Sequence, residues 1–152
     1  HSRENVIEFC TKLKSARPEM NFSADIIAGF PTESQDMFEN TVSLIEECEI
    51  NWLHVFPFSA RPGTPAARMP QISRSIIEKR ATELRNISKN KLSQHLDRKV
   101  GSIQSVLVET NSKGFTQDFS KVTFPKGPDI GEIIEMRIKS HENSELVGLP
   151  IS

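Results

Sequence analysis

Apolar side chains recur at helical spacing in three stretches of this chain. Residues 3–15 keep apolar positions three or four residues apart, and Ser2 precedes them as a candidate N-cap. A second amphipathic run begins after Thr32 and ends near Cys48, and Thr32 is predicted to form a capping box with Gln35. A third run covers residues 73–99, with Ser75 and Glu78 as its capping box. The pattern predicts three helices, and the third carries an apolar stripe of Ile77, Ala81, Leu84, Ile87, Leu92 and Leu96.

Two β-prone runs alternate with these helices. Residues 21–28 and 51–58 are apolar apart from a few polar positions, and each ends in a proline-containing turn. The order helix, strand, helix, strand, helix predicts an α/β fold with parallel strands and crossover helices. Because two strands cannot close a barrel, we expect further strands to precede them in a longer protein. The first residue, His1, is not Met, which agrees with that expectation.

After Gly101 the apolar period changes from helical spacing to two. Short alternating runs follow at residues 103–108, 114–124, 131–140 and 145–149, with a hairpin loop expected at residues 141–144. Several short strands separated by Gly and Pro turns are typical of a small antiparallel barrel of the OB type. The pattern therefore predicts an all-β module at the end of the chain.

Charge changes this picture only locally. The chain has 19 Lys and Arg against 20 Asp and Glu, a formal net charge of −1. Eight basic and three acidic residues lie within residues 73–99, whereas residues 100–152 hold five basic and seven acidic ones. The third helix is thus a modest basic element, either a solvated face or a connector beside an RNA backbone, and not a polycationic nucleic-acid binder.

The composition excludes several other classes of protein. Cys10 and Cys48 are far apart in sequence and lie in helical patterns, so we expect small buried side chains and no metal cluster. No apolar run approaches the ~20 residues of a membrane span, and no signal-peptide pattern opens the chain. We expect a cytoplasmic protein without a membrane partner.

Candidate chemistry gathers where the two β-prone runs end. Asp25 stands in an apolar strand, where a carboxylate needs a partner. It could be a structural residue that is hydrogen-bonded to the backbone or paired with an Arg. Alternatively, it could accept hydrogen bonds from the hydroxyls of a ribose. Gly29 permits close approach of a ligand to the backbone, and Arg61 can pair with a carboxylate or phosphate. His54 is interpreted as a core or barrel-lumen side chain, and Trp52 as a core side chain.

Two motifs resemble a known family. Residues 53–59 and 60–70 read LHVFPFS and ARPGTPAARMP, and residues 25–33 read DIIAGFPTE. They resemble the radical-SAM methylthiotransferases that modify tRNA, most of all the subfamily acting on threonylcarbamoyladenosine. The last third is similar, in outline, to the family's TRAM module.

The resemblance implies a division of the chain and a set of roles. Residues 1–90 would be the C-terminal part of a radical-SAM barrel, and residues 91–152 the end of a linker helix and a TRAM-like β-domain. The implied cofactors are S-adenosylmethionine and 4Fe-4S clusters, and the implied partner is tRNA, bound by a monomer. The chain lacks the family's closely spaced cluster cysteines, so we expect no catalytic or metal-ligating residue in it and no activity from it alone. Asp25 and Gly29 would contact S-adenosylmethionine, and Arg61 would pair either with its carboxylate or with the substrate. Contacts with tRNA would come from Arg68, Arg74, Lys79 and Arg80.

Two alternatives remain open at this point. The chain could be a stand-alone RNA-binding protein that acts through its basic helix and β-module, with Phe115 or Phe119 stacking on bases if they are not core residues. It could also be a radical-SAM relative with a substrate other than RNA.

Overall fold

The computed structural model describes residues 2–125 and 128–151 and divides the chain into two units, His1–Lys91 and Leu92–Ser152. The boundary falls within the third helix, α3 (Arg74–Asp97). Each unit has its own cluster of buried apolar residues. The two are therefore described separately.

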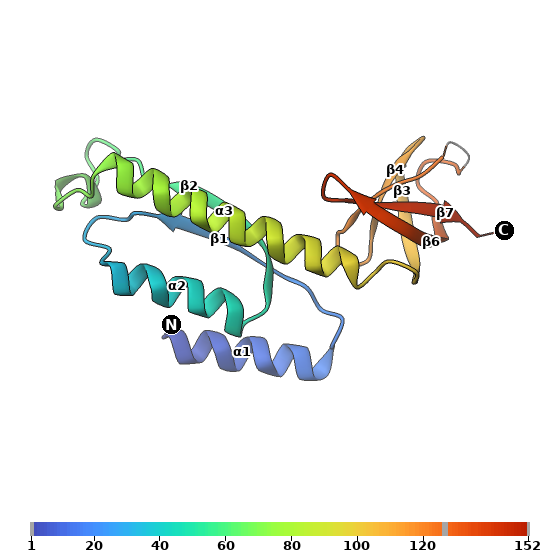
Figure 1. Cartoon of the computed structure of the whole chain (residues 1–152), viewed down its shortest axis with the longest axis horizontal. Coiled ribbons are helices and arrows are strands. Elements are labelled where there is room, and N and C mark those ends of the chain that lie inside the picture. The colour runs from blue at the N-terminus through green and yellow to red at the C-terminus, as the bar shows by residue number, and fades with distance from the viewer. Residues whose placement is uncertain (1, 126–127, 152) are drawn as a thin grey trace. The chain divides into compact units, whose positions relative to one another are not determined.

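The first unit is a strand–helix–strand motif flanked by two more helices (Figure 1). Strands β1 and β2 pair in parallel, from Phe22 beside Ile50 to Ala28 beside Pro57, as the alternation of elements predicted. Because this sheet has two strands among the described residues, the unit shows an α/β motif and not a barrel. Its elements before α3 are α1 (Arg3–Ala16), β1 (Phe22–Ala28), α2 (Gln35–Glu47), β2 (Ile50–Pro57) and the short η1 (Ala66–Arg68).

The first residues of these helices follow local chemistry, with two corrections. The prediction that Ser75 caps the third helix is wrong, because α3 begins at Arg74 and Ser75 lies within it. Ser2 caps α1 as predicted, since its hydroxyl accepts from the Asn5 N–H and the Asn5 side chain accepts from the Ser2 N–H. The prediction that Thr32 caps α2 is wrong. Thr32 has a left-handed backbone (φ 71°), and the cap is Ser34, whose side chain accepts from the Met37 N–H.

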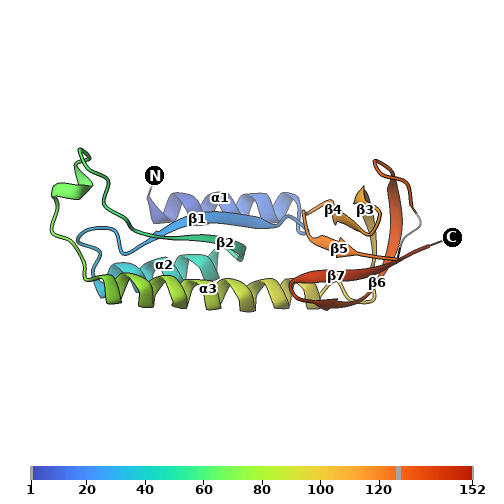
Figure 2. The ribbon, with the colours of Figure 1, turned by 90° about the horizontal axis from the view of Figure 1, so that it is seen from above.

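The three helices pack on one face of the β1–β2 sheet. Ala28 is buried there together with Phe38 and Ile45 of α2 and Ala81 and Leu84 of α3. Neighbouring half-buried side chains extend this core along α1 and both strands: Val6, Ile7, Phe22, Ala24, Ile26, Leu53 and Val55. Ala81, Leu84 and Ile87 of the apolar stripe predicted for the third helix thus belong to the core that covers the sheet (Figure 2). Leu92 and Leu96 of the same stripe belong to the core of the second unit.

The opposite face of the sheet, which we call the open face, is largely solvent-exposed. Strand periodicity places Ser23, Asp25 and Ile27 of β1 on this face, and all three are exposed. In the parallel register their partners on β2 are Trp52, His54 and Phe56, of which His54 and Phe56 are exposed. Trp52 is half-buried and His54 is exposed, so neither is a core side chain within this unit, and the barrel-lumen position of His54 stays a prediction.

The second unit is a closed five-stranded barrel. Its strands follow the order β3-β4-β5-β7-β6, and β6 returns to pair with β3. All neighbouring strands pair in an antiparallel way except β5 and β7, which are parallel. The prediction of an antiparallel barrel is therefore wrong for this one pair of strands. The arrangement is compatible with a TRAM-like OB domain. The strands are β3 (Ile103–Thr110), β4 (Lys113–Thr116), β5 (Lys121–Thr123), β6 (Ile133–Glu142) and β7 (Glu145–Pro150).

The barrel interior is filled by apolar side chains, and Leu96 of α3 belongs to the same cluster. The alternation read from the sequence identifies most of this core, which includes Val106, Val108, Val122, Phe124, Met136, Ile138 and Leu146. Two expectations change. The hairpin loop is only Asn143 and Ser144, because β6 extends to Glu142. Phe119 is not a core residue but lies exposed in the turn between β4 and β5.

Candidate functional site

The open face brings Asp25 and His54 side by side. Asp25 lies in the middle of β1 and pairs in register with His54 on β2. Both side chains are exposed, so neither pays the cost of burying an unpaired polar group. An exposed carboxylate at this place can accept hydrogen bonds from the hydroxyls of a ligand, and the imidazole beside it can donate or accept one.

The turns that follow the two strands are held together at the carboxyl end of the sheet. The Phe58 N–H donates to the Ala28 carbonyl over 2.9 Å, and the rings of Phe30 and Phe58 meet edge to face with centroids 5.4 Å apart. These contacts fix the chain where it leaves β2 and enters the proline-rich loop.

Gly29 has a structural role in this turn. Its backbone is left-handed (φ 76°), and a Cβ at this position would lie 2.5 Å from Cγ1 of Ile77 on α3. The close neighbour expected to be a ligand is therefore a side chain of the protein itself. The Gly29 N–H donates to the Glu33 carboxylate over 3.0 Å.

Arg80 completes the same turn from α3. Its guanidinium donates to the Glu33 carboxylate over 2.6 Å and to the Glu33 carbonyl over 2.9 Å, and it lies 5.3 Å from the centre of the Phe38 ring. The residue is only 6% exposed. Its charge is thus used within the fold, where it joins the turn after β1 to α3, and is not presented to a phosphate on the surface.

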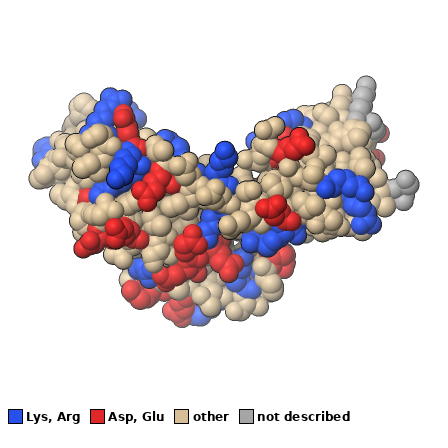
Figure 3. Space-filling model, viewed as in Figure 1, with Lys and Arg blue, Asp and Glu red and all other residues tan. Residues whose placement is uncertain are grey.

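The other cations named from the sequence are exposed. Arg61 and Arg68 lie in the proline-rich loop, whose backbone is tied by hydrogen bonds from Thr64 to the Arg61 carbonyl. Arg74 and Lys79 lie on α3, and Arg74 forms an exposed ion pair with Glu78 at 2.7 Å. Figure 3 shows basic and acidic residues interspersed on the visible face of this unit, in keeping with the modest net charge.

The two cysteines are buried in the first unit and are not disulfide-bonded. Burial, together with the neighbouring Cys10 thiol, raises the pKa of the Cys48 thiol to about 11. Among the described residues, no group of three or more His, Cys, Asp or Glu side chains is arranged to hold a metal ion. Two buried cysteines are too few to ligate an iron–sulfur cluster, which is usually held by three or four cysteine thiolates.

We expect the Cys48 thiol of the folded chain to resist alkylation by iodoacetamide at about pH 8, because the reactive thiolate is scarce and buried. Mass spectrometry of the labelled chain checks this. The same chain in concentrated urea serves as the control and should be labelled at both Cys10 and Cys48. Rapid labelling of Cys48 under native conditions would contradict the buried environment described here.

A polar cluster missed by the sequence analysis lies in the second unit. Asp118 accepts from His95 over 2.8 Å and pairs with Lys99 over 2.9 Å, and Thr116 and Ser120 donate to its other oxygen. Burial alone would raise the pKa of Asp118, but the hydrogen bonds from His95, Thr116 and Lys99 outweigh burial and hold it well below its ordinary value of 3.8. Nothing in the local pattern signals this cluster, since His95 and Asp118 are 23 positions apart.

No helix in the described part of the chain is both long and apolar enough to cross a bilayer. A search of protein-family profiles finds no match to the chain.

Three curated proteins that are similar to this chain are named for the methylthiolation of an adenosine in tRNA. The chain is 48% identical, over 98% of its length, to threonylcarbamoyladenosine tRNA methylthiotransferase MtaB of Rickettsia prowazekii. It is 34% identical over 97% of its length to the tRNA-2-methylthio-N(6)-dimethylallyladenosine synthase of Bacillus subtilis, and 35% identical over 91% to that of Yersinia pestis.

The chain spans about one third of the length of these relatives, 34% of the Rickettsia protein and 31% of the other two. The resemblance seen in its two motifs thus extends over nearly the whole sequence. The chain belongs to the family of tRNA methylthiotransferases.

Proposed function

We propose that this chain is the C-terminal portion of an enzyme that methylthiolates N6-threonylcarbamoyladenosine next to the anticodon of tRNA. The observation that carries the proposal is its 48% identity to the relative named for threonylcarbamoyladenosine, against 33–35% for relatives named for dimethylallyladenosine. The βαβ motif and the closed barrel agree with a division into residues 1–90 as part of a radical-SAM core and residues 91–152 as a TRAM-like domain.

The cofactors of this proposal differ in how well the chain fits them. Radical chemistry and the methyl group would come from S-adenosylmethionine and 4Fe-4S clusters. The exposed Asp25 carboxylate suits the ribose hydroxyls of S-adenosylmethionine, and Arg61 suits its carboxylate. Gly29 would support that site only indirectly, through the turn that it shapes. The described residues do not fit a cluster, so we expect this chain alone not to cleave S-adenosylmethionine.

The exposed cations supply the proposed contacts with tRNA. Arg68, Arg74 and Lys79 are accessible to phosphates, whereas the buried pair with Glu33 removes Arg80 from this set. With tRNA as substrate, the enzyme would act in the cytoplasm, and we expect it to act as a monomer.

We expect deletion of the complete gene in its native host to abolish the 2-methylthio group of threonylcarbamoyladenosine in tRNA. The nucleoside without that group should accumulate, because the preceding modification does not need this enzyme. Mass spectrometry of digested host tRNA measures both nucleosides. The deleted strain carrying the intact gene on a plasmid is the control and should recover the modification.

Other outcomes of the same measurement distinguish the alternatives. Loss of the methylthio group from the dimethylallyl nucleoside alone would keep the family and overturn the proposed substrate. An unchanged set of tRNA nucleosides would overturn the proposal of a tRNA-modifying activity.

A further inference from the structure

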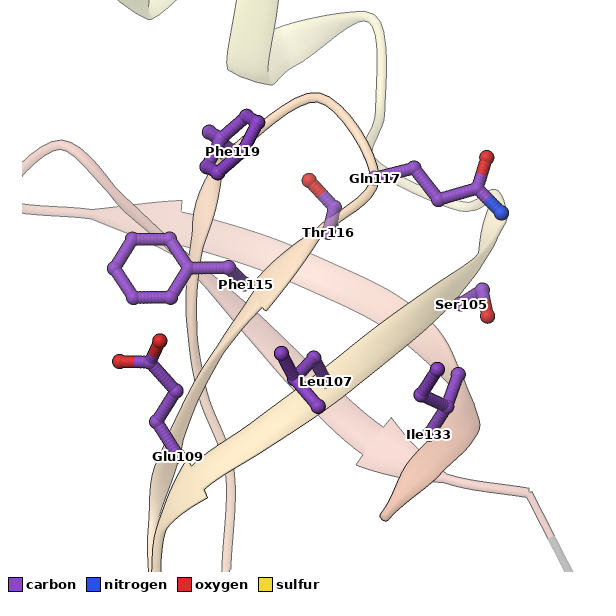
Figure 4. Close-up of a pocket in the computed structure, with 8 residues that line it drawn as sticks. All are labelled: Ser105, Leu107, Glu109, Phe115, Thr116, Gln117, Phe119 and Ile133. Carbon is purple, nitrogen blue, oxygen red and sulfur yellow. The ribbon is translucent and has the colours of Figure 1, made fainter. Parts of the chain in front are cut away.

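The outside of the barrel carries an apolar pocket of about 400 Å³. Leu107 of β3 forms its floor, with Phe115 and Phe119 on one side and Ile133 on the other (Figure 4). The remaining lining residues are polar: Ser105, Glu109, Thr116 and Gln117. A volume of this size suits a small planar ligand rather than a protein segment.

Phe119 is unusual both in its exposure and in its backbone. It is 79% exposed and has a left-handed backbone (φ 62°), a conformation that bulky side chains rarely adopt. The fold thus accepts both an exposed aromatic ring and a strained backbone at one residue. Such a combination points to a role for the ring outside the core.

The turn that carries Phe119 is fixed by the Asp118 cluster. Asp118 accepts from Thr116 on one side of Phe119 and from Ser120 on the other, and His95 and Lys99 hold the same carboxylate from the end of α3. The Phe119 N–H also donates to the Thr116 carbonyl over 3.0 Å. The ring is therefore presented from a rigid turn, which lowers the entropy cost of using it to bind a ligand.

The charge of the pocket selects among ligands. Among the described residues that line it, Glu109 is the one charged side chain. A carboxylate disfavours a phosphate but accepts hydrogen bonds from an amino group. The aromatic rings suit the face of a planar, uncharged group, and Ser105, Thr116 and Gln117 offer hydroxyl and amide groups to its edge.

We propose that this pocket binds an unpaired nucleobase with an exocyclic amino group, stacked on Phe119 and Phe115. The proposal rests on the proposed function, in which tRNA is the substrate, and adds a subsite for one base outside the double-stranded parts of the RNA. Stacking on exposed aromatic side chains is the common way in which proteins hold unpaired bases. It also explains how a barrel with more acidic than basic residues contributes to RNA binding.

The test measures binding of the full chain to an RNA hairpin whose loop contains a fluorescent adenine analogue. A blunt duplex with the same stem is the second ligand. The native chain should bind the hairpin more tightly than the duplex and should change the fluorescence of the analogue, since stacking alters it. Phe119→Ala should weaken hairpin binding roughly tenfold or more and remove the fluorescence change, with little effect on duplex binding. Phe115→Ala is a second variant, expected to act in the same direction.

Phe9→Ala is the matched control, because Phe9 is also exposed (61%) but lies on α1 in the other unit. It should bind the hairpin like the native chain, and thermal unfolding should show that all variants fold. Equal affinity of Phe119→Ala and the native chain for the hairpin would overturn the proposal, as would equal affinity of the native chain for hairpin and duplex. Loss of self-association in Phe119→Ala, seen by light scattering, would instead assign the pocket to a second copy of the chain. The tRNA nucleoside analysis is independent of this pocket, so the proposed function can stand when the subsite fails.

Discussion

Arg80→Ala is expected to lower the free energy of unfolding of the first unit by about 3–5 kcal/mol, the cost of removing one partner from a buried ion pair. The substitution would leave the Glu33 carboxylate, also nearly buried, without its cation. It would also remove the donor to the Glu33 carbonyl and the packing of the guanidinium over Phe38. Since Glu33 also accepts from the Gly29 N–H, the whole turn after β1 would loosen.

Urea unfolding followed by tryptophan fluorescence measures this loss in the correct unit. Trp52 is the single tryptophan of the chain and lies on β2, so its signal reports on the first unit. Arg74→Ala is the matched control on the same helix, because the Arg74 side chain is 91% exposed and its pair with Glu78 is screened by solvent. We expect its effect to stay within about 0.5 kcal/mol. Equal effects of the two substitutions would refute the description of Arg80 as a buried structural cation.

Asp118→Ala is expected to destabilise the barrel by about 3 kcal/mol, because it leaves buried donors without an acceptor. The Lys99 ammonium and the His95 imidazole both lose the carboxylate, and so do the hydroxyls of Thr116 and Ser120. The barrel contains no tryptophan, so the methyl NMR signals of Val106 and Val122 in its core are the appropriate probes during urea unfolding. Glu145→Ala is the control, since the pair between Lys113 and Glu145 lies at the surface and should contribute about 1 kcal/mol or less.

The stabilisation from Asp118 should also depend on pH. The pKa of this carboxyl is lower in the folded chain than in the unfolded chain, so unfolding takes up a proton at low pH. The contribution is therefore fully present well above the unfolded value of 3.8 and declines as the pH falls below it. The difference in unfolding free energy between the native chain and Asp118→Ala should be larger at about pH 7 than at about pH 3. A difference that is constant over this range would show that Asp118 has the same proton affinity in both states.

The elements of this fold were predictable where local patterns determine them. The helical stripe from Ile77 to Leu96 identified the apolar residues of α3 that are buried or half-buried, and the alternation around Val106 and Met136 identified the barrel core. The parallel β1–β2 pair followed from the order of elements. For α3 and the barrel strands, the period of apolar residues is imposed by the geometry of the element itself.

The rest depends on contacts that no local pattern contains. Arg80 looks like the other basic residues of α3 until the fold brings Glu33, 47 positions earlier, against it. The Asp118 cluster depends on the end of α3 meeting the turn between β4 and β5. In the same way, the parallel β5–β7 seam results from barrel closure. Phe119 was interpreted as a strand residue because its apolar side chain fits the alternation, and only the positive φ reveals the turn.

The open face of the β1–β2 sheet affects how the sequence can evolve. Ala24 and Ile26 face the helices, so an exchange there must be compensated by neighbours such as Phe38 to keep the core filled. Asp25 and Ile27, on the same strand, are under no such constraint from within this unit. Selection at alternate positions of one strand thus comes from two sources. Substitutions at the helix-facing positions should keep the volume of the core constant. Substitutions at the open-face positions should instead depend on the molecule that this face contacts.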